Sequence, residues 1–281
     1  MAHDSGDIFS LSSRLSAKLF KKWLRSVLVP VDYTRTVEIP ALLNSSSVLD
    51  EQRPLRILDI GSPQILSLAL ASISKEWEIT YINVFQQEID DLLFKSHALN
   101  LKNISVINHD VTCPLPISEK YDYIFSCSVF EHIVPEENGD SLAASLIGNY
   151  LAEGGVFAIS IPFYKYAFNE YVNCDVYGRP NPEAERIFFQ RFYDESSLAK
   201  RLIDVTGLKL RDMSFVGERF WFPGNPHKRL AIALGASLLG VLSGRLNRLL
   251  GRIFLEISDD WRTLRKPYLA IVTMQKGTSR A

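Results

Sequence analysis

Several features that define large protein classes are scarce in this chain of 281 residues. Its three cysteines, Cys113, Cys127 and Cys174, are widely spaced and include no CxxC pair, which argues against a disulfide framework and against structural zinc. Lysine and arginine form no dense run and the net charge is −1, so the chain lacks the general basic field that holds nucleic acid. We therefore expect no nucleic-acid partner and no metal site.

Long apolar stretches are also missing. The longest uncharged stretch near the C-terminus, LAIALGASLLGVLSG at 230–244, has 15 residues, fewer than a membrane-spanning helix needs. The first residues, MAHDSGDIFS, contain two acids and no apolar run, so we expect no signal peptide. Because the odd cysteine count fits a reducing compartment, the sequence predicts a cytoplasmic protein.

The chain does contain a regular alternation of strand-like and helix-like segments from residue 55 onward. The strand-like runs are LRILDI, WEITYINV, ISVIN, YDYIFSCS, GGVFAISIP and, at the C-terminal end, PYLAIVTMQ. Apolar runs separated by helix-length segments are typical of a doubly wound α/β protein whose parallel sheet is buried on both faces. Between the last two runs, the sequence predicts a helix capped by Asp194 and ended by Gly207, followed by a strand.

One aromatic segment, 164–191, interrupts the alternation. It contains four tyrosines and two prolines, and we expect a loop or lid over the sheet edge. Tyrosine rings with hydroxyl groups suit sugars or aromatic ligands, but packing within a long loop also explains them.

Two further segments are basic and amphipathic. In 8–31, lysines and arginines lie opposite an apolar stripe at helical spacing, and no acid is present. In 226–257, Arg245, Arg248 and Arg252 lie near one helical face. Such segments are compatible with peripheral contact with an anionic membrane surface. The open alternatives are a lid over the site and a homodimer face.

Polar residues gather where the predicted strands end, which is the edge at which open α/β sheets bind ligands. Asp59, Gly61 and Ser62 follow the first strand, and Asn83 follows the second. The remaining ones are Asp110 after the third strand, Ser126 after the fourth, and Glu131 with His132 in the next turn.

The order LDIG, ISVINHDVTCPLP, YDYIFSCSVFEHI and YLAEGGVFAISIP resembles class I S-adenosylmethionine-dependent methyltransferases, in particular their small-molecule branch of type 11/12. The resemblance covers residues 55–213. It implies a seven-stranded Rossmann-like sheet with an antiparallel last strand, and S-adenosylmethionine as cofactor. The implied organisation is an N-terminal helical cap at 1–50, a methyltransferase core at 51–215 and 267–281, and a helical insertion at 216–266.

The same resemblance implies roles for the strand-end residues. It places Asp59, Gly61 and Ser62 around the methionine part of the cofactor. It places Asp110 on the adenine amino group, Val111 beside the adenine ring, and Ser126 at the strand end that faces the sulfonium.

The chain departs from the family pattern at two places in this region. Pro63 and Ile65 stand where the family continues with glycines, and Asn83 replaces the acid that binds both ribose hydroxyls. An asparagine can still accept a hydrogen bond from one hydroxyl, so the expected loss is roughly 1 to 2 kcal/mol. Proline suits the first turn of a helix. We therefore expect a rebuilt cofactor loop.

His132 is the candidate general base, because the ordinary pKa of histidine lies near neutrality and an oxygen or nitrogen acceptor must lose a proton. Glu131 would orient His132 or bind a substrate cation. The alternative is that this pair only caps or packs the following helix.

The resulting hypothesis is methyl transfer from S-adenosylmethionine to a small-molecule, sugar or lipid-linked acceptor. An alternative is a catalytically weak or inactive protein of the same fold that acts as a binding module. A nicotinamide-dependent oxidoreductase fits the sheet, but the chain lacks GxGxxG and the ribose acid.

Overall fold

The computed structural model describes residues 34–173, 186–220 and 249–278. The predicted helix at 8–31 and most of the segment at 226–257 lie outside these ranges. In chain order the main elements are α2 (Arg35–Ser46), β1 (Arg56–Ile60), α3 (Ile65–Ile73), β2 (Glu78–Asn83), α4 (Gln86–Leu99), β3 (Ile104–Asn108), β4 (Tyr121–Cys127), α5 (Gly139–Tyr150), β5 (Leu151–Pro162), β6 (Phe168–Val172), β7 (Ile187–Phe192), α6 (Glu195–Leu198), β8 (Lys209–Glu218), β9 (Leu255–Ser258) and β10 (Pro267–Gln275).

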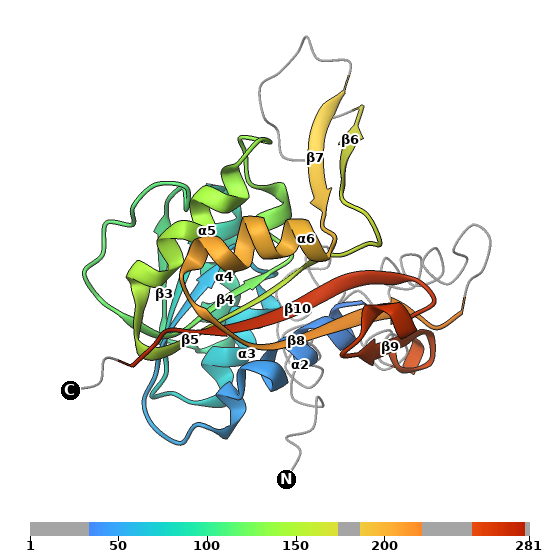
Figure 1. Ribbon diagram of the computed structural model, residues 1–281. Helices are drawn as coiled ribbons and strands as arrows, with labels where there is room; N and C mark the ends of the chain where they lie inside the picture. The colour runs from blue at the N-terminus through green and yellow to red at the C-terminus, as the bar shows by residue number, and fades with distance from the viewer. Residues whose placement is uncertain (1–33, 174–185, 221–248, 279–281) are drawn as a thin grey trace.

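The central sheet has the strand order β3-β2-β1-β4-β5-β10-β8-β9 (Figure 1). Strands β1 to β5 run parallel, and β10 pairs antiparallel with both β5 and β8. The seven predicted strands are all present, and the antiparallel position of the last strand is confirmed. An eighth strand, β9, extends the sheet by pairing antiparallel with β8.

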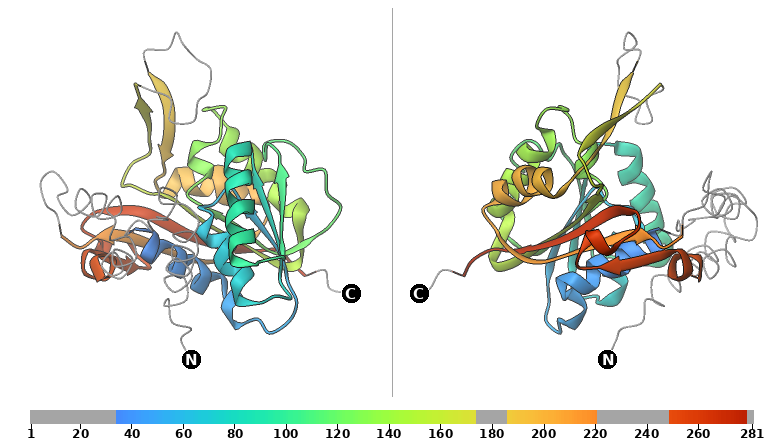
Figure 2. Two further views of the ribbon diagram at one scale, coloured as in Figure 1. Left: turned by 180° about the vertical axis from the view of Figure 1, so that it is seen from behind. Right: turned by 45° about the vertical axis from the view of Figure 1, so that its right-hand side comes forward.

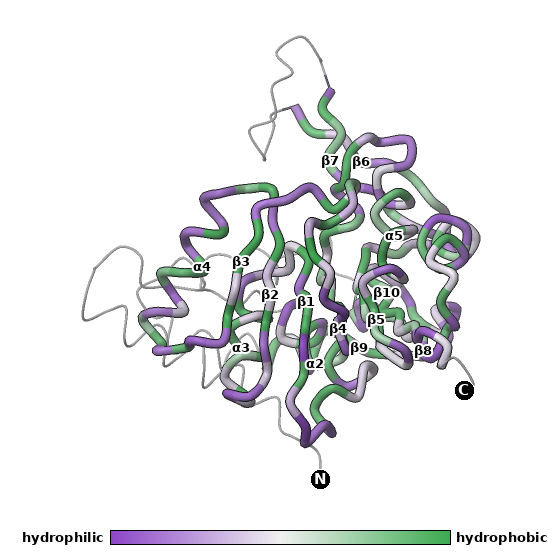
Figure 3. The backbone as a smooth tube through the Cα atoms, turned by 90° about the vertical axis from the view of Figure 1, so that its left-hand side faces the viewer, coloured by the Kyte–Doolittle hydropathy of each residue, from purple (hydrophilic) through white to green (hydrophobic). Residues whose placement is uncertain are grey.

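Helices cover both faces of the sheet, as expected for a doubly wound fold (Figure 2). On one face, apolar side chains of α2, α3 and α4 pack against β1, β2 and β5. On the other face, α5 and α6 pack against β4, β5 and β10. Strand β5 serves both layers, because Ala158 and Val156 face the first while Phe157 and Ile159 face the second. Figure 3 shows the apolar residues concentrated along the central strands.

The described part of the predicted helical insertion contains more than helix. Residues 249–254 form a short helix that leads directly into β9. No helix within the described ranges is long and apolar enough to cross a membrane.

The described residues of the aromatic segment, which was predicted as a loop or lid, contain two paired strands. Strands β6 and β7 form a separate two-stranded antiparallel sheet, which projects from the body of the molecule in Figures 1 and 2. Its base is joined to the end of β5, because Tyr193 donates its N–H to the Pro162 carbonyl and Tyr164 donates to the Tyr193 carbonyl. The aromatic and β-branched residues of Ile187–Phe192 suit a strand, and the prediction of a loop missed this signal.

Helix α6 is continued by a π-helical turn, Ala199–Ile203, and a 3-10 turn, Asp204–Thr206. This helical stretch begins and ends at the predicted residues. The Asp194 carboxylate accepts a hydrogen bond from the Ser197 backbone N–H, and Ser197 Oγ accepts one from the Asp194 N–H. Gly207 adopts the left-handed conformation, with φ of 65°, at the end of the last helical turn. Both features follow from ordinary helix-end chemistry.

Candidate functional site

The first strand ends in a tight turn built around Asp59 and Gly61. Gly61 has φ of 61° and donates its N–H to the Ile82 carbonyl of β2 at 2.8 Å. A Cβ at this position would lie 3.1 Å from Val129 Cγ1, so the turn needs glycine for conformation and for space. Asp59 is fully buried, and burial raises its pKa to about 6.

Ser62 and Ser126 join the ends of β1 and β4. Ser62 Oγ accepts a hydrogen bond from the Cys127 N–H at 2.9 Å, and Ser126 Oγ donates to the Ile60 carbonyl at 3.3 Å. Pro63 lies just before α3, and its carbonyl accepts the Leu66 N–H at 2.8 Å. The N-cap of α3 is Gln64, so Pro63 precedes the helix and the first-turn position expected from the sequence is wrong.

Asn83 is engaged in local contacts at the end of β2. Its Nδ2 donates to the Tyr81 hydroxyl at 2.8 Å, and its Oδ1 accepts the Phe85 N–H at 2.9 Å. These bonds fix the turn into α4.

Asp110 and Val111 follow β3 at the same edge of the sheet. Asp110 is exposed, and its Oδ1 accepts hydrogen bonds from the backbone N–H and the hydroxyl of Thr112. Val111 is partly buried and packs against the apolar cluster on the face of the sheet covered by α5 and α6. Both hydrogen bonds of this turn are made by Oδ1, and neither involves Oδ2 of Asp110.

Glu131 and His132 lie in a single helical turn, Phe130–His132, directly after β4. Glu131 is buried with 1% exposure, and within the described ranges its Oε2 has no hydrogen-bond partner. Burial raises the pKa of Glu131 to about 8, against the opposing effects of its own backbone N–H and the charge of Arg35. Glu131 Oε1 lies 3.7 Å from His132 Nε2, and His132 Nδ1 lies 2.8 Å from the Phe189 carbonyl oxygen.

A buried ionic cluster beneath this turn was missed by the sequence prediction. Glu38 of α2 is 2% exposed, pairs with Arg35, and its Oε1 accepts hydrogen bonds from Ser128 at 2.6 Å and Ser160 at 2.7 Å. Burial alone would raise the pKa of Glu38, but the Arg35 charge and the two hydroxyls outweigh it and hold that pKa below its usual value. Ser160, a polar residue inside an apolar strand, was the available signal.

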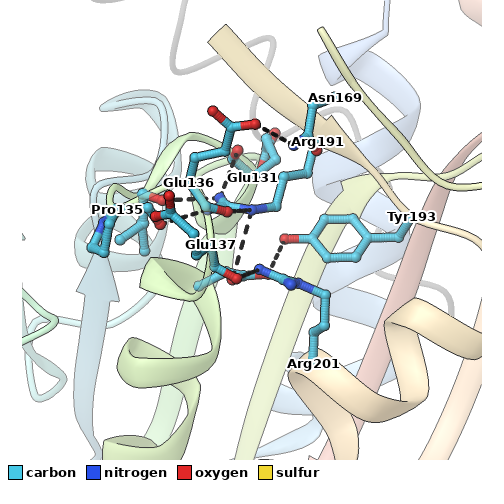
Figure 4. Close-up of polar contacts among 10 residues, drawn as sticks. Glu131, Pro135, Glu136, Glu137, Asn169, Arg191, Tyr193 and Arg201 are labelled. Atoms are coloured by element: carbon cyan, nitrogen blue, oxygen red, sulfur yellow. Dashed lines mark hydrogen bonds and ion pairs between the residues drawn. The ribbon is translucent and has the colours of Figure 1, made fainter. Parts of the chain in front are cut away.

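A second missed residue is Arg191 of β7, which is buried next to the Glu131 turn (Figure 4). Its guanidinium donates to the carbonyls of Glu131, Ile133, Pro135 and Glu136. The hairpin is thereby tied to the loop that carries Glu131 and His132.

The tyrosines of the hairpin region partly cluster with one another. Tyr164, Tyr166 and Phe168 have ring centroids 5.0 to 6.0 Å apart, and Tyr166 is 61% exposed. Tyr177 lies outside the described residues. A polar cavity of about 400 Å³ lies at the opposite edge of the sheet, near Arg53 and Asp122, away from these residues. Within the described ranges, no group of three or more histidine, cysteine or acidic residues is placed to hold a metal ion.

The strand order, the two helical layers and the position of the polar edge define the fold of class I S-adenosylmethionine-dependent methyltransferases. A crystal structure of coclaurine N-methyltransferase bound to N-methylheliamine and S-adenosylhomocysteine matches 86% of this chain and 73% of its own, with a TM-score of 0.57 and 16% identity. A methyltransferase from Clostridium acetobutylicum matches 93% of this chain and 97% of its own, with a TM-score of 0.52 and 14% identity.

The [4+2]-cyclase SpnF also has this fold, matching 86% of this chain and 81% of its own with a TM-score of 0.55 and 15% identity. No protein-family model matches the chain. No curated protein matches it in sequence. The structural likeness thus establishes the fold, and function has to be argued from the site.

Proposed function

We propose that this chain is an S-adenosylmethionine-dependent methyltransferase acting on a small-molecule, sugar or lipid-linked acceptor. The supporting observation is the edge formed by β1 and β4, where the Gly61 turn faces the Val129–His132 loop. In an open α/β sheet this is the edge at which ligands bind. The structures of coclaurine N-methyltransferase and of NodS from Bradyrhizobium japonicum, both with S-adenosylhomocysteine, support the same cofactor.

Most of the edge residues fit this cofactor. The left-handed Gly61 permits close approach of the backbone, and Asp59 Oδ1 is a buried oxygen with no hydrogen-bond partner in the described ranges. Asp110 would hold the adenine amino group through a carboxylate oxygen. Arg35, with a side chain 27% exposed beside Cys127, adds a positive charge suited to a carboxylate. Asn83 contributes less than an acid would, because its amide already serves the turn into α4.

In this proposal the cofactor supplies an electrophilic methyl group on a good leaving group, and the chain supplies alignment. Holding acceptor and methyl group in line contributes up to ~7 to 11 kcal/mol. His132 takes the proton of an oxygen or nitrogen acceptor. Glu131, with a pKa near 8, is mostly uncharged at neutral pH, so it is not a counter-ion for a substrate cation. Its Oε1 lies 3.7 Å from His132 Nε2, beyond hydrogen-bond distance.

A second candidate is a binding module that has kept the fold. It is favoured by the internal hydrogen bonds that already engage Ser62 and Asn83, and by Val129, whose Cγ1 would lie 3.1 Å from a Cβ at Gly61 and thus fills space beside the turn. The cyclase SpnF adds that this fold also carries chemistry other than the transfer of a methyl group.

Calorimetric titration of the purified full chain with S-adenosylmethionine and S-adenosylhomocysteine separates these candidates. Binding of both is expected for the methyltransferase. Absence of binding heat at millimolar ligand would contradict the methyltransferase proposal and favour the binding module. NADH serves as the negative control. Binding heat with NADH and with neither S-adenosyl compound would support the oxidoreductase alternative.

The Asp110→Asn variant sharpens this titration. Loss of a charge-assisted bond to the adenine amino group should weaken S-adenosylhomocysteine binding about tenfold. The matched control is Asp122→Asn, which changes an acid paired with Arg53 at the opposite edge of the sheet and should leave the affinity unchanged. Equal affinities of the two variants would contradict the assigned role of Asp110.

A further inference from the structure

We propose that the β6–β7 hairpin sets the proton position on His132, with the Phe189 carbonyl and the Arg191 guanidinium as positioning groups that leave Nε2 as the proton-accepting atom. The relevance of this inference to catalysis rests on the proposed function of His132 as a base. The proton position itself is a property of the protein that can be measured without cofactor or acceptor.

The first step concerns the hydrogen bond between His132 and Phe189. His132 Nδ1 lies 2.8 Å from the Phe189 carbonyl oxygen. A carbonyl oxygen can only accept, so Nδ1 must carry the proton. In the neutral imidazole the other ring nitrogen, Nε2, is then the unprotonated one. Strand β7, far along the chain from His132, therefore decides which nitrogen can take a proton.

The second step concerns what keeps His132 next to Phe189. Arg191 follows Phe189 by two residues in the same strand, and its side chain is 4% exposed. Nε donates to the Glu136 carbonyl at 3.2 Å. Nη1 donates to Glu131 at 3.2 Å and Ile133 at 2.9 Å, and Nη2 donates to Pro135 at 2.9 Å and Glu136 at 2.7 Å.

All the N–H donors of the guanidinium are thus used on one loop. An arginine has five such donors in a rigid planar fork, and here each reaches a backbone carbonyl between Glu131 and Glu136. Figure 4 shows the guanidinium surrounded by these carbonyls. Since His132 lies between two of the bound residues, the loop cannot move away from β7 without breaking several bonds.

The charge of Arg191 is balanced from beneath by Asp140 of α5. Asp140 Oδ1 lies 3.7 Å from Arg191 Nε, while the carboxylate also accepts hydrogen bonds from Tyr193 at 2.7 Å and from Arg201 at 2.9 and 2.6 Å. The closest contacts of Arg191 are therefore the carbonyls of the loop, and Asp140 supplies the opposite charge that a buried guanidinium needs. A lysine would keep the charge but lose the fork.

The hairpin is linked to the loop at its other strand as well. Glu136 Oε1 accepts a hydrogen bond from Asn169 Nδ2 at 2.7 Å and another from the Tyr171 hydroxyl, both from β6. These contacts, unlike those of Arg191, lie on the surface. They add a second attachment without touching the His132 turn.

The test is nitrogen NMR of the full chain labelled at histidine, near neutral pH. The chain has five histidines, and a His132→Gln variant identifies the His132 signals by their loss. A protonated and an unprotonated ring nitrogen differ strongly in chemical shift. The expected wild-type spectrum has Nδ1 protonated and Nε2 unprotonated. A spectrum dominated by the Nε2–H form would overturn the proposal.

Two variants separate positioning from general packing. Arg191→Lys should convert the single form of His132 into a mixture of both forms, whereas an unchanged spectrum would refute the role of Arg191. Phe189→Leu removes the ring that packs 5.0 Å from the His132 ring but keeps the carbonyl, so the wild-type form should persist. If Arg191→Lys does not fold, Phe189→Leu still decides, because a shift to the other form would place control in the ring and not in the carbonyl.

The outcome is independent of the cofactor titration. A chain with the Nδ1–H form that binds neither S-adenosylmethionine nor its product would refute the proposed function and leave this inference standing. A chain that binds the cofactor but shows the Nε2–H form would refute this inference and leave the proposed function standing.

Discussion

At the scale of single residues, Gly61 is the position where one added methyl group has two separable effects. The Gly61→Ala variant must hold a left-handed conformation, which costs about 1 to 2 kcal/mol for a residue with a side chain. It must also displace Val129, which lies 3.1 Å from the new Cβ. We expect a loss of unfolding free energy of about 2 to 3 kcal/mol in chemical denaturation, and weaker S-adenosylhomocysteine binding.

Gly207→Ala is the matched control for this substitution. Gly207 has φ of 65°, but nothing lies within 4 Å of its added Cβ. Only the conformational cost, about 1 to 2 kcal/mol, should appear, with no change in ligand affinity. If both variants lose the same unfolding free energy, the contact with Val129 does not affect the stability of the Gly61→Ala variant.

Two buried carboxyl groups near the site show that burial alone does not set a charge. Glu131 and Glu38 are both almost completely buried. The pKa of Glu131 rises to about 8, whereas that of Glu38 is lowered because Arg35 and two hydroxyls oppose the desolvation. At neutral pH the same residue type is thus mostly neutral in the turn after β4 and charged in α2.

At the scale of elements, Glu38 is the main polar attachment of α2 to the ends of β4 and β5. Replacing Glu38 by Gln leaves Arg35 unpaired and two hydroxyls with a weaker acceptor. We expect the unfolding free energy at pH 7 to fall by about 3 kcal/mol, the scale for breaking a buried pair. Urea denaturation of both proteins measures the difference.

The pH dependence of that difference has a defined sign. The folded-state pKa of Glu38 lies below its usual 4.5, so its contribution is fully present above that pH. As pH falls through the folded-state pKa the contribution is lost, and wild type and Glu38→Gln should converge. Glu195→Gln is the control, because its pair with Arg262 is exposed and contributes less than about 1 kcal/mol. A gap between wild type and Glu38→Gln that widens in acid would contradict the assigned pKa direction.

At the scale of the whole molecule, the region around β9 presents apolar residues to solvent. Leu249 and Ile253 of the short helix are 54% and 42% exposed, and Ile257 of β9 is 50% exposed. They lie next to Arg252, one of the three arginines predicted to meet anionic lipid, which is exposed. Arg245 and Arg248 lie outside the described residues. We expect the full chain to float with anionic liposomes and to lose this after all three arginines are changed to Glu.

The three arginines would together contribute about 3 kcal/mol at an anionic surface, so the loss should be clear. The matched control changes Arg53, Arg56 and Arg211 to Glu, which alters net charge equally at exposed positions away from β9. Equal flotation of the two triple variants would refute the basic contact and favour a lid or dimer face.

Local sequence patterns were sufficient for seven of the eight strands of the central sheet and for their order along the chain. Runs such as LRILDI and GGVFAISIP predict buried strands because apolar residues on both faces suit only the middle of a layered fold. The run ISVIN was also expected to be buried on both faces, but it forms the edge strand β3, whose residues are exposed or only partly buried. Asp194 and Gly207 predict helix ends because the chemistry of a helix terminus involves only neighbours in sequence. The edge carrying Asp59, Asp110 and Glu131 followed from the same rule, since parallel strands bring their carboxyl ends together.

The sequence alone therefore determined the α/β class and the list of polar residues at one edge of the sheet. Only the tertiary structure decided the burial, charge and contacts of these residues: Glu131 is buried and largely neutral, and Asn83 serves a turn. It also revealed the charged Glu38, which the sequence prediction missed. The eighth strand, the hairpin and the contacts of Arg191 with the Glu131 turn also needed it. The physical reason is that burial, charge pairing and carbonyl contacts depend on segments distant in the chain, which no local pattern encodes.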